Sequence, residues 1–434
     1  MEADRNIPTY SELLRTFTRI GFLSFGGPAG QIALMQHEIV DERRWVDQGA
    51  FLRALNLCHL LPGPEAQQLA TWIGWRLHGI KGGLSAGLLF VIPGAVVMLG
   101  LSLLYVMAAG LTWFAALFLG IKAAVLAIVA QALIRIGSRA LGTRFKLALA
   151  GLSFVAIAVF DAPFPLVILL AALIGAVAGK VRPDWLGAHG HLANTAAHAP
   201  KKRLAVETLV TVITWLFVWL APMALIGMTL GTDHTLWEIG AFFSRLAVVT
   251  FGGAYAVLAY MAQAAVENFG WLSAGEMADG LGLAETTPGP LIMVTQFVGF
   301  LAAWRSPEPF SPLLAGAIGA GLTTWVTFAP CFLWIFACAP WMDRLERMPA
   351  LQAALAAITA AVVGVVAQLA AWFAAHVLFL RPEAGPLGLP DLASFDWRAG
   401  VIAIAAAILL FRLKRGVLEV LAVSAIAGLL LGQI

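Results

Sequence analysis

Two short motifs place glycine and proline inside apolar stretches of this sequence, and each occurs twice. Proline has no backbone N–H and its ring clashes with the preceding helical turn, so neither motif fits inside a continuous helix. A helix that starts after such a break has unpaired N–H groups and about half a positive charge. Such a helix start binds anions. The motif residues that we expect to bind an anion are Gly26, Gly27, Pro28, Pro62, Gly63, Pro64, Gly252, Gly253, Pro288, Gly289 and Pro290.

Basic and amide side chains near these motifs can complete an anion site. Arg19 and Arg245 each lie six residues before the phenylalanine of a Phe-Gly-Gly motif. We expect them to clamp an oxyanion with their planar donor forks, the alternative being that they extend to lipid headgroups. Lys122 lies inside an apolar stretch, where it either binds the anion or forms a buried ion pair. Gln67 and Gln68 follow the first Pro-Gly-Pro motif and are expected to be neutral donors.

Three titratable residues accompany the Pro-Gly-Pro motifs. His59 and Glu285 each stand three residues before one of these motifs, and Glu65 directly follows the first. Histidines and carboxylates inside membranes often relay protons, so we expect these residues to couple protons to the anion. The alternative is that they hydrogen-bond to the broken backbone. The second Pro-Gly-Pro motif is followed by apolar residues where the first is followed by polar ones. We therefore expect the first half to supply more of the substrate contacts.

The elements that carry these motifs must lie in a membrane. Of the 434 residues, 61% are hydrophobic and only 12% are charged, whereas soluble domains carry about 25% charged residues. The composition therefore predicts an all-α polytopic membrane protein in contact with the lipid bilayer. The net charge of +3 is too small to indicate nucleic acid as a partner. The three cysteines lack metal-site spacing and no cofactor motif occurs, so we expect neither metal nor cofactor.

The sequence repeats itself. "RIGFLSFGG" at 19–27 and "RLAVVTFGG" at 245–253 match at an offset of 226 residues, which also relates the two Pro-Gly-Pro motifs. "IKAAVLAIVAQ" and "ITAAVVGVVAQ" match further along at an offset of 237. Matched motifs with equal internal spacing predict two structural repeats. We expect an N-terminal repeat at 1–180, a cytoplasmic linker at 181–204 and a C-terminal repeat at 205–434.

Apolar segments predict about four membrane-spanning helices in each repeat. They fall at 84–106, 112–135, 145–160 and 164–180, and again at 312–338, 351–378, 398–412 and 416–432. The glycine and proline motifs each join two shorter arms, which predicts two re-entrant broken-helix hairpins per repeat. One extra leading span at 205–230 inverts the second repeat, and inverted repeats are typical of secondary transporters.

Basic loops set the expected orientation. Lysine and arginine gather in "RIGSRALGTRFK", in the linker, in "DRLERM" and in "FRLKR". Because cytoplasmic loops carry the excess of these residues, we expect the N-terminus and the linker in the cytoplasm and the C-terminus outside.

The motifs and their surroundings resemble the chromate ion transporter family, specifically its long members with two copies of the domain. The resemblance rests on "FGGPAGQIALMQHEIVDERRWVD", "LLPGPEAQQLATWIGWRLHGIKGGLSAGLLFVIPG", "FGGAYAVLAYMAQAAVENFGWLS" and "TTPGPLIMVTQFVGF". It implies a bacterial inner-membrane protein that exports chromate and confers resistance to it. Sulfate is an analogue, because both ions are tetrahedral dianions. A homodimer is expected only from the frequency of twofold assemblies.

Electrostatics favours export. A charge that moves down a membrane potential of 100 mV gains roughly 2.3 kcal/mol, and a dianion gains roughly twice that on leaving a negative interior. No ATP-binding motif occurs, so we expect the membrane potential or an ion gradient to drive transport. Two alternatives stay open, namely transport or exchange of sulfate or another oxyanion, and an anion channel. We expect no enzymatic activity, since a chromate reductase needs a redox cofactor.

Overall fold

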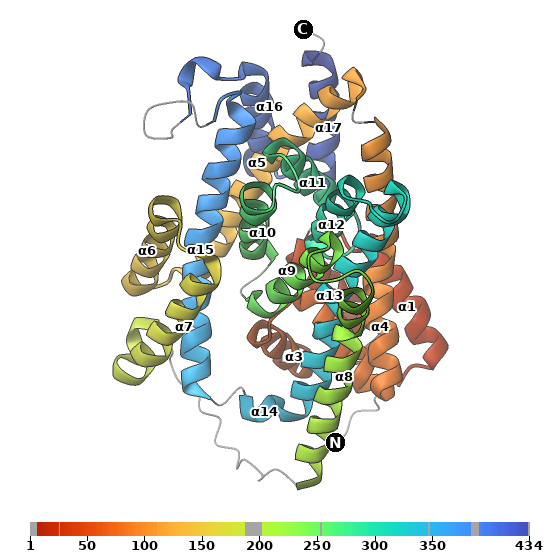
Figure 1. Cartoon of the computed structure of the whole chain (residues 1–434). Helices are drawn as coiled ribbons and strands as arrows, with labels where there is room; N and C mark the ends of the chain where they lie inside the picture. The colour runs from red at the N-terminus through yellow and green to blue at the C-terminus, as the bar shows by residue number, and fades with distance from the viewer. Residues whose placement is uncertain are drawn as a thin grey trace.

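The described residues of the computed structural model fold almost entirely into helices (Figure 1). Six of these helices are long and apolar enough to cross a bilayer by length and composition. The chain is therefore a multi-pass membrane protein, as the composition predicts. The structure describes residues 7–25, 27–108, 110–186, 202–251, 254–345, 348–382 and 390–432.

Most α-helices of the first half begin at a polar cap or at a predicted break. The Thr9 hydroxyl accepts the N–H of Glu12 in a capping box before the first helix, and Asp47 accepts the N–H of Ala50 before the third. The helices that follow the two motifs start within one residue of the expected prolines. The helices are α1 (Tyr10–Leu23), α2 (Gly27–Gln36), α3 (Gln48–Leu60), α4 (Glu65–Ala108), α5 (Thr112–Ala140), α6 (Arg144–Phe160) and α7 (Phe164–Val181).

The second half repeats this order after one extra helix, α8 (Lys202–Thr229), which coincides with the predicted extra span. The helices α9, α10 and α11 correspond to α1, α2 and α3, and α12 with α13 corresponds to α4. The helices α15, α16 and α17 correspond to α5, α6 and α7. Their bounds are α9 (Thr235–Val249), α10 (Ala254–Gln263), α11 (Ala274–Thr286), α12 (Val294–Arg305), α13 (Pro312–Cys338), the short α14 (Met342–Leu345), α15 (Pro349–Leu378), α16 (Trp397–Ala407) and α17 (Val417–Leu431).

The element α4 consists of two helices joined by a sharp turn. His78 and Gly79 have non-helical backbone angles, with φ of −135° and +61°. The two arms pack against each other at Gly74 and Gly82, where a Cβ on either glycine would meet the carbonyl oxygen of the other at 2.2 Å. The same close approach joins α12 to α13 at Gly299 and Gly319. Each half therefore has a short helix, a turn and a long helix after its Pro-Gly-Pro motif.

Three of the predicted spans form helices that are shorter than a bilayer requires. The segment 145–160 forms α6, which has 17 residues, and 416–432 forms α17, which has 15. The segment 398–412 forms α16 with 11 residues, followed by one turn of π-helix at Ile408–Arg412. A straight span needs about 20 residues. The three apolar segments are themselves shorter than about 20 residues, so the sequence already indicates short helices here.

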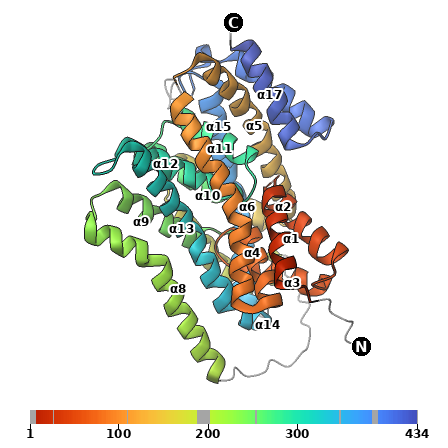
Figure 2. The ribbon, with the colours of Figure 1, turned by 90° about the vertical axis from the view of Figure 1, so that its right-hand side faces the viewer.

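Long helices of each half pack against the other half. α5 contacts α16 and α17, and α15 makes the equivalent contacts with α6 and α7. α4 and α13 also lie side by side, as Figures 1 and 2 both show. The two halves are therefore interleaved rather than separate along the chain. Of the predicted linker, residues 187–201 lie outside the described part of the structure.

Candidate functional site

The helix breaks of the two halves contact each other directly. The N–H of Gly63 donates to the carbonyl oxygen of Thr250, and the N–H of Gly289 donates to that of Ser24, both over 2.8 Å. The offset of 226 residues relates both donors and both acceptors, so the two hydrogen bonds are equivalent. Each Pro-Gly-Pro break is thus tied to the Phe-Gly-Gly break of the other half.

The glycine of each Pro-Gly-Pro motif is required by its backbone conformation and by the lack of room for a side chain. Gly63 has φ of +115° and Gly289 has φ of +89°, a region that side chains with a Cβ rarely adopt. A Cβ on Gly63 would lie 2.9 Å from the sulfur of Cys331, and one on Gly289 would lie 3.3 Å from the Cα of Gly94. Gly94 in α4 and Cys331 in α13 are equivalent at the offset of 237. The junction of the four breaks therefore has approximate internal twofold symmetry.

A cavity of about 420 Å³ lies beside this junction. It is bounded by the start of α2, the end of α3, the start of α4, one face of α5, and residues of α11, α15 and α17. Apolar residues form much of its wall, and the polar and motif residues that line it come from both halves. These residues are Gly27, Pro28, His59, Glu65, Gln131, Arg135, Arg139, Glu285 and Thr359.

Two helix N-termini lie at the cavity. Gly27 and Pro28 belong to the first turn of α2, and Glu65 is the first residue of α4. The first N–H groups of a helix have no partner within it, and the helix dipole places partial positive charge there. The second half contributes Glu285 instead, while its Gly289 packs against α4. The first half thus supplies more of the cavity's polar wall.

Arg135 and Arg139 of α5 also line the cavity, although the sequence analysis assigned their segment only to a basic loop. With Gln131 they follow a spacing of four residues, which places all three on one helix face. The Nη2 of Arg135 lies 3.5 Å from the Oε1 of Gln131, and both arginines are exposed. This spacing could have revealed the two arginines from the sequence, because Gln131 is the last residue of the matched segment "IKAAVLAIVAQ". Two guanidinium groups and two helix starts supply anion-binding donors at the cavity, beside the carboxyl groups of Glu65 and Glu285.

Comparison with known proteins identifies the family to which this chain belongs. The sequence profile of the chromate transporter family matches residues 11–176 and 237–430, one region in each half. The chain belongs to the chromate transporter family. Membership places it among transporters, and this agrees with the number of long apolar helices. No solved structure gives a significant match to the chain.

Several named proteins of this family are similar over most of their length. A chromate transport protein of Pseudomonas aeruginosa is 32% identical over 84% of this chain and 80% of its own. A chromate transport protein of Cupriavidus metallidurans is 28% identical over 83% of this chain and 82% of its own. A probable chromate transport protein of Synechococcus elongatus is 27% identical over 83% of this chain and 84% of its own.

Four side chains that the sequence analysis expected to bind the anion are not part of the cavity wall. The Nζ of Lys122 is 3.1 Å from Oδ1 of Asp279 in α11, the ion-pair alternative of the sequence analysis. Gln67 and Gln68 are buried and donate to Thr71 and to the carbonyl of Pro62. Arg245 is exposed, and its Nε donates to a backbone carbonyl of its own helix. Gly26, Gly252 and Gly253 lie outside the described residues.

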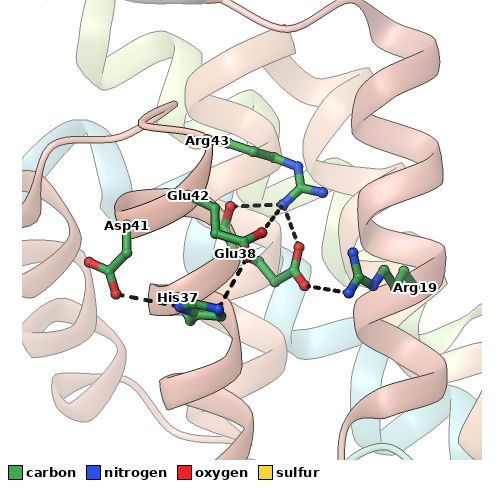
Figure 3. Close-up of polar contacts among 6 residues, drawn as sticks. All are labelled: Arg19, His37, Glu38, Asp41, Glu42 and Arg43. Atoms are coloured by element: carbon green, nitrogen blue, oxygen red, sulfur yellow. Dashed lines mark hydrogen bonds and ion pairs between the residues drawn. The ribbon is translucent and has the colours of Figure 1, made fainter.

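Arg19 of α1 belongs to a polar cluster with residues of the π-helix His37–Glu42 and Arg43 (Figure 3), and it is not part of the cavity wall. Its Nη2 lies 3.5 Å from Oε1 of Glu38, whose side chain is only 3% exposed. Arg43 binds the other carboxylate oxygen of Glu38, and His37 and Glu42 complete the cluster at its exposed edge. Glu38 lies in a π-helix, His37–Glu42, and a second π-helix follows α10 at Ala264–Asn268. The arginine therefore neutralises a buried carboxylate, a role that the sequence analysis did not anticipate.

We expect Arg19→Ala to leave chromate flux within about twofold of the unmodified protein, because Arg19 does not line the cavity and Arg43 still pairs with the buried Glu38. Glu38→Ala leaves two arginines without their carboxylate and is expected to destabilise the protein more. Thermal unfolding and vesicle flux of both variants, with Arg245→Ala as the matched control, test this. Loss of flux in Arg19→Ala with normal thermal stability would contradict this expectation and indicate that Arg19 contacts the transported anion.

The described residues contain no group of three or more histidine, cysteine, aspartate and glutamate side chains arranged to hold a metal ion. Cys58 and Cys331 are buried free thiols, and Cys338 is partly buried.

Proposed function

We propose that this chain exports chromate from the cytoplasm across the inner membrane and thereby confers chromate resistance. The proposal rests on one observation above all. The starts of α2 and α4 and the two arginines of α5 converge on a single cavity between the halves of the chain. The names of the related proteins make chromate the first substrate to consider. Sulfate is the second, because it has the same shape and charge.

The cavity is chemically suited to a doubly charged tetrahedral ion. Guanidinium groups donate two parallel hydrogen bonds to oxyanions, and helix N-termini add N–H donors without a full positive charge. A water molecule occupies roughly 30 Å³ in the liquid. The cavity volume of about 420 Å³ therefore accommodates an oxyanion together with part of its hydration shell. Partial hydration lowers the cost of desolvating a dianion, which suits release as well as binding.

We further propose that the two halves are inverted repeats, and that α1 with α2 and α3 with the first arm of α4 are re-entrant hairpins. The lengths of α1 and α3, 14 and 13 residues, support this, since neither can span a bilayer. Arg135 and Arg139 belong to a basic segment, and such segments favour the cytoplasm. The cavity is accordingly proposed to open to the cytoplasm, with the N-terminus inside and the C-terminus outside.

Chromate and sulfate flux in proteoliposomes, with imposed voltage and pH gradients, tests the function. We expect saturable chromate efflux that an interior-negative potential accelerates, because the dianion gains roughly 2.3 kcal/mol per charge for each 100 mV. Single-channel currents would instead indicate the channel. Sulfate flux without chromate flux would reassign the substrate, and the absence of both would refute the proposal.

We propose that Glu65, His59 and Glu285 couple protons to transport, since all three line the cavity together with Arg135 and Arg139. A protonated carboxyl or a charged imidazole attracts the dianion more than the deprotonated group does, so flux should rise as the pH on the cavity side falls. Glu65→Gln and Glu285→Gln are expected to flatten this dependence, and the exposed Glu267→Gln is the control. Unchanged pH profiles in both cavity variants would exclude the two carboxyl groups from proton coupling and leave His59 alone in that role.

A further inference from the structure

Equivalent faces of α3 and α11 have opposite burial. On α11 the residues Asp279, Gly282 and Glu285 follow a spacing of three and are all buried. On α3 the equivalent positions, reached by the offset of 226, are Arg53, Asn56 and His59, and all three are exposed. Two repeats with the same helices therefore differ in whether this face is covered.

The difference has a structural cause. In the second half, α10 packs on α15, and α11 packs on both α5 and α15. In the first half, the cavity lies between α2 and α3 on one side and α5 and α15 on the other. The closed contact is tight, because a Cβ on Gly282 would lie 2.3 Å from the Cγ2 of Ile121 in α5. The molecule is open on the face of α2 and α3 and closed on the equivalent face of α10 and α11.

An ion pair between the partly buried Lys122 and the buried Asp279 holds the closed face. Lys122 of α5 lies 3.1 Å from Oδ1 of Asp279, and the hydroxyl of Tyr105 in α4 donates to the other carboxylate oxygen over 2.7 Å. Asp279 is 6% exposed. The residue equivalent to Lys122 is Thr359, which lines the open cavity. Lys122 therefore occupies the place on the closed face that Thr359 occupies on the open face.

We infer that the chain has a second access state in which α10 and α11 separate from α5 and α15, and in which Lys122 leaves Asp279 and binds the departing anion. In that state α2 and α3 close on α5 and α15 through the contact now made by α11. This inference rests on the proposed anion transport and adds to it an exit site for an oxyanion. His59 at the end of α3 and Glu285 at the end of α11 both line the cavity, and in this inference they contact the anion in both states.

Exchange of partners explains how a buried ion pair can open. A lysine that loses a carboxylate in a low-dielectric setting is left with an uncompensated charge, which is unfavourable. A doubly charged oxyanion supplies that compensation as it arrives, so opening without the anion is disfavoured. Asp279 keeps the hydroxyl of Tyr105 as a donor.

Disulfide trapping tests the inference. In Ile121→Cys/Gly282→Cys the two Cβ positions are 3.7 Å apart, within the range of about 3.5–4.5 Å for a disulfide. We expect Cu(II)-phenanthroline to join these residues in membranes, with the bond assigned by mass spectrometry, and chromate flux to fall to background. Dithiothreitol, removed before the assay, should restore flux. Ile121→Cys/Gly282→Ala is the matched control and should be insensitive to the oxidant.

The repeat-related positions 56 and 358, which correspond to 282 and 121, report on the inferred second state. Asn56 of α3 is exposed here and Ile358 of α15 is buried, and the inferred state brings the cysteines of Asn56→Cys/Ile358→Cys as close as positions 121 and 282 are now. Because the inferred state needs the anion, we expect this pair to cross-link in membranes when chromate is present and to stop flux reversibly. A fully cross-linked 121–282 protein that still transports overturns the inference, and so does a 56–358 pair that never cross-links with or without chromate and voltage.

A third measurement separates the role of Lys122 as an anion contact from the movement of α10 and α11. Lys122→Gln/Asp279→Asn keeps a hydrogen-bonded pair but removes the cation, so we expect both cysteine pairs still to cross-link while chromate flux falls about tenfold. Unchanged flux would overturn the role of Lys122 as an anion contact. If the unmodified protein moves neither chromate nor sulfate, the proposed function fails instead, and cross-linking of both pairs still reports the two states.

Discussion

Replacing both Arg135 and Arg139 by alanine is expected to reduce chromate flux by roughly 100-fold. A hydrogen bond to a charged group contributes about 1.5–3 kcal/mol, or at least about tenfold for each residue. The lower end of that range applies here, because both side chains are exposed to the cavity and water screens their charge. Flux in proteoliposomes at several chromate concentrations measures the effect, which should fall mainly on apparent affinity.

Two variants control for the loss of positive charge in general. Arg144→Ala removes an exposed arginine at the start of α6, only five residues beyond Arg139 and not part of the cavity wall, and it should transport normally. Arg135→Lys/Arg139→Lys keeps the charge but loses the planar fork, so partial recovery is expected. Equal flux in the double alanine variant and the unmodified protein would exclude these arginines from anion binding.

Gly63→Ala is expected to abolish transport and to lower the midpoint of thermal unfolding. The backbone angle of +115° disfavours any residue with a Cβ by about 1–3 kcal/mol, and the new methyl group would lie 2.9 Å from the sulfur of Cys331. The strain falls on the residue whose N–H binds Thr250, so the junction between the breaks should distort. Thermal unfolding and flux of the purified variant measure the two effects separately.

Two further variants serve as controls for Gly63→Ala. Gly100→Ala lies inside a long helix with no atom within 4 Å of the added Cβ, and it should be neutral. Gly63→Ala/Cys331→Ala removes the contact with the sulfur but keeps the backbone strain and the contact with Nε2 of Gln68 at 3.0 Å, so only part of the stability should return. Normal flux in Gly63→Ala would show that transport does not depend on the geometry of this break.

Local signals account for most of what the sequence predicted about the fold. The apolar segment predicted at 312–338 coincides with α13, and the extra span predicted at 205–230 coincides with α8 to within three residues. The breaks at the glycine and proline motifs also occur where expected, because proline and glycine act on the backbone around them. The matching order of helices follows from the same repeated motifs, which fix where each helix starts.

Tertiary packing decided the features that the sequence did not predict. Whether Arg19 faces the cavity or Glu38 depends on how α1 docks against the π-helix that follows α2, and no local pattern carries that information. Arg135 and Arg139 were assigned to a basic loop because the end of α5 could not be placed from hydropathy. The opposite burial of α3 and α11 depends on how each packs against α5 and α15, and the matching motifs carry no information on that packing.

Locating the bound ion tests the central claim most directly. A structure of the protein with chromate, in which anomalous scattering at the chromium absorption edge identifies the metal, should place chromium in the cavity. We expect it beside the first turns of α2 and α4 and within hydrogen-bonding reach of Arg135 or Arg139. Chromium bound elsewhere in the protein, or an empty cavity at saturating chromate, would contradict the account.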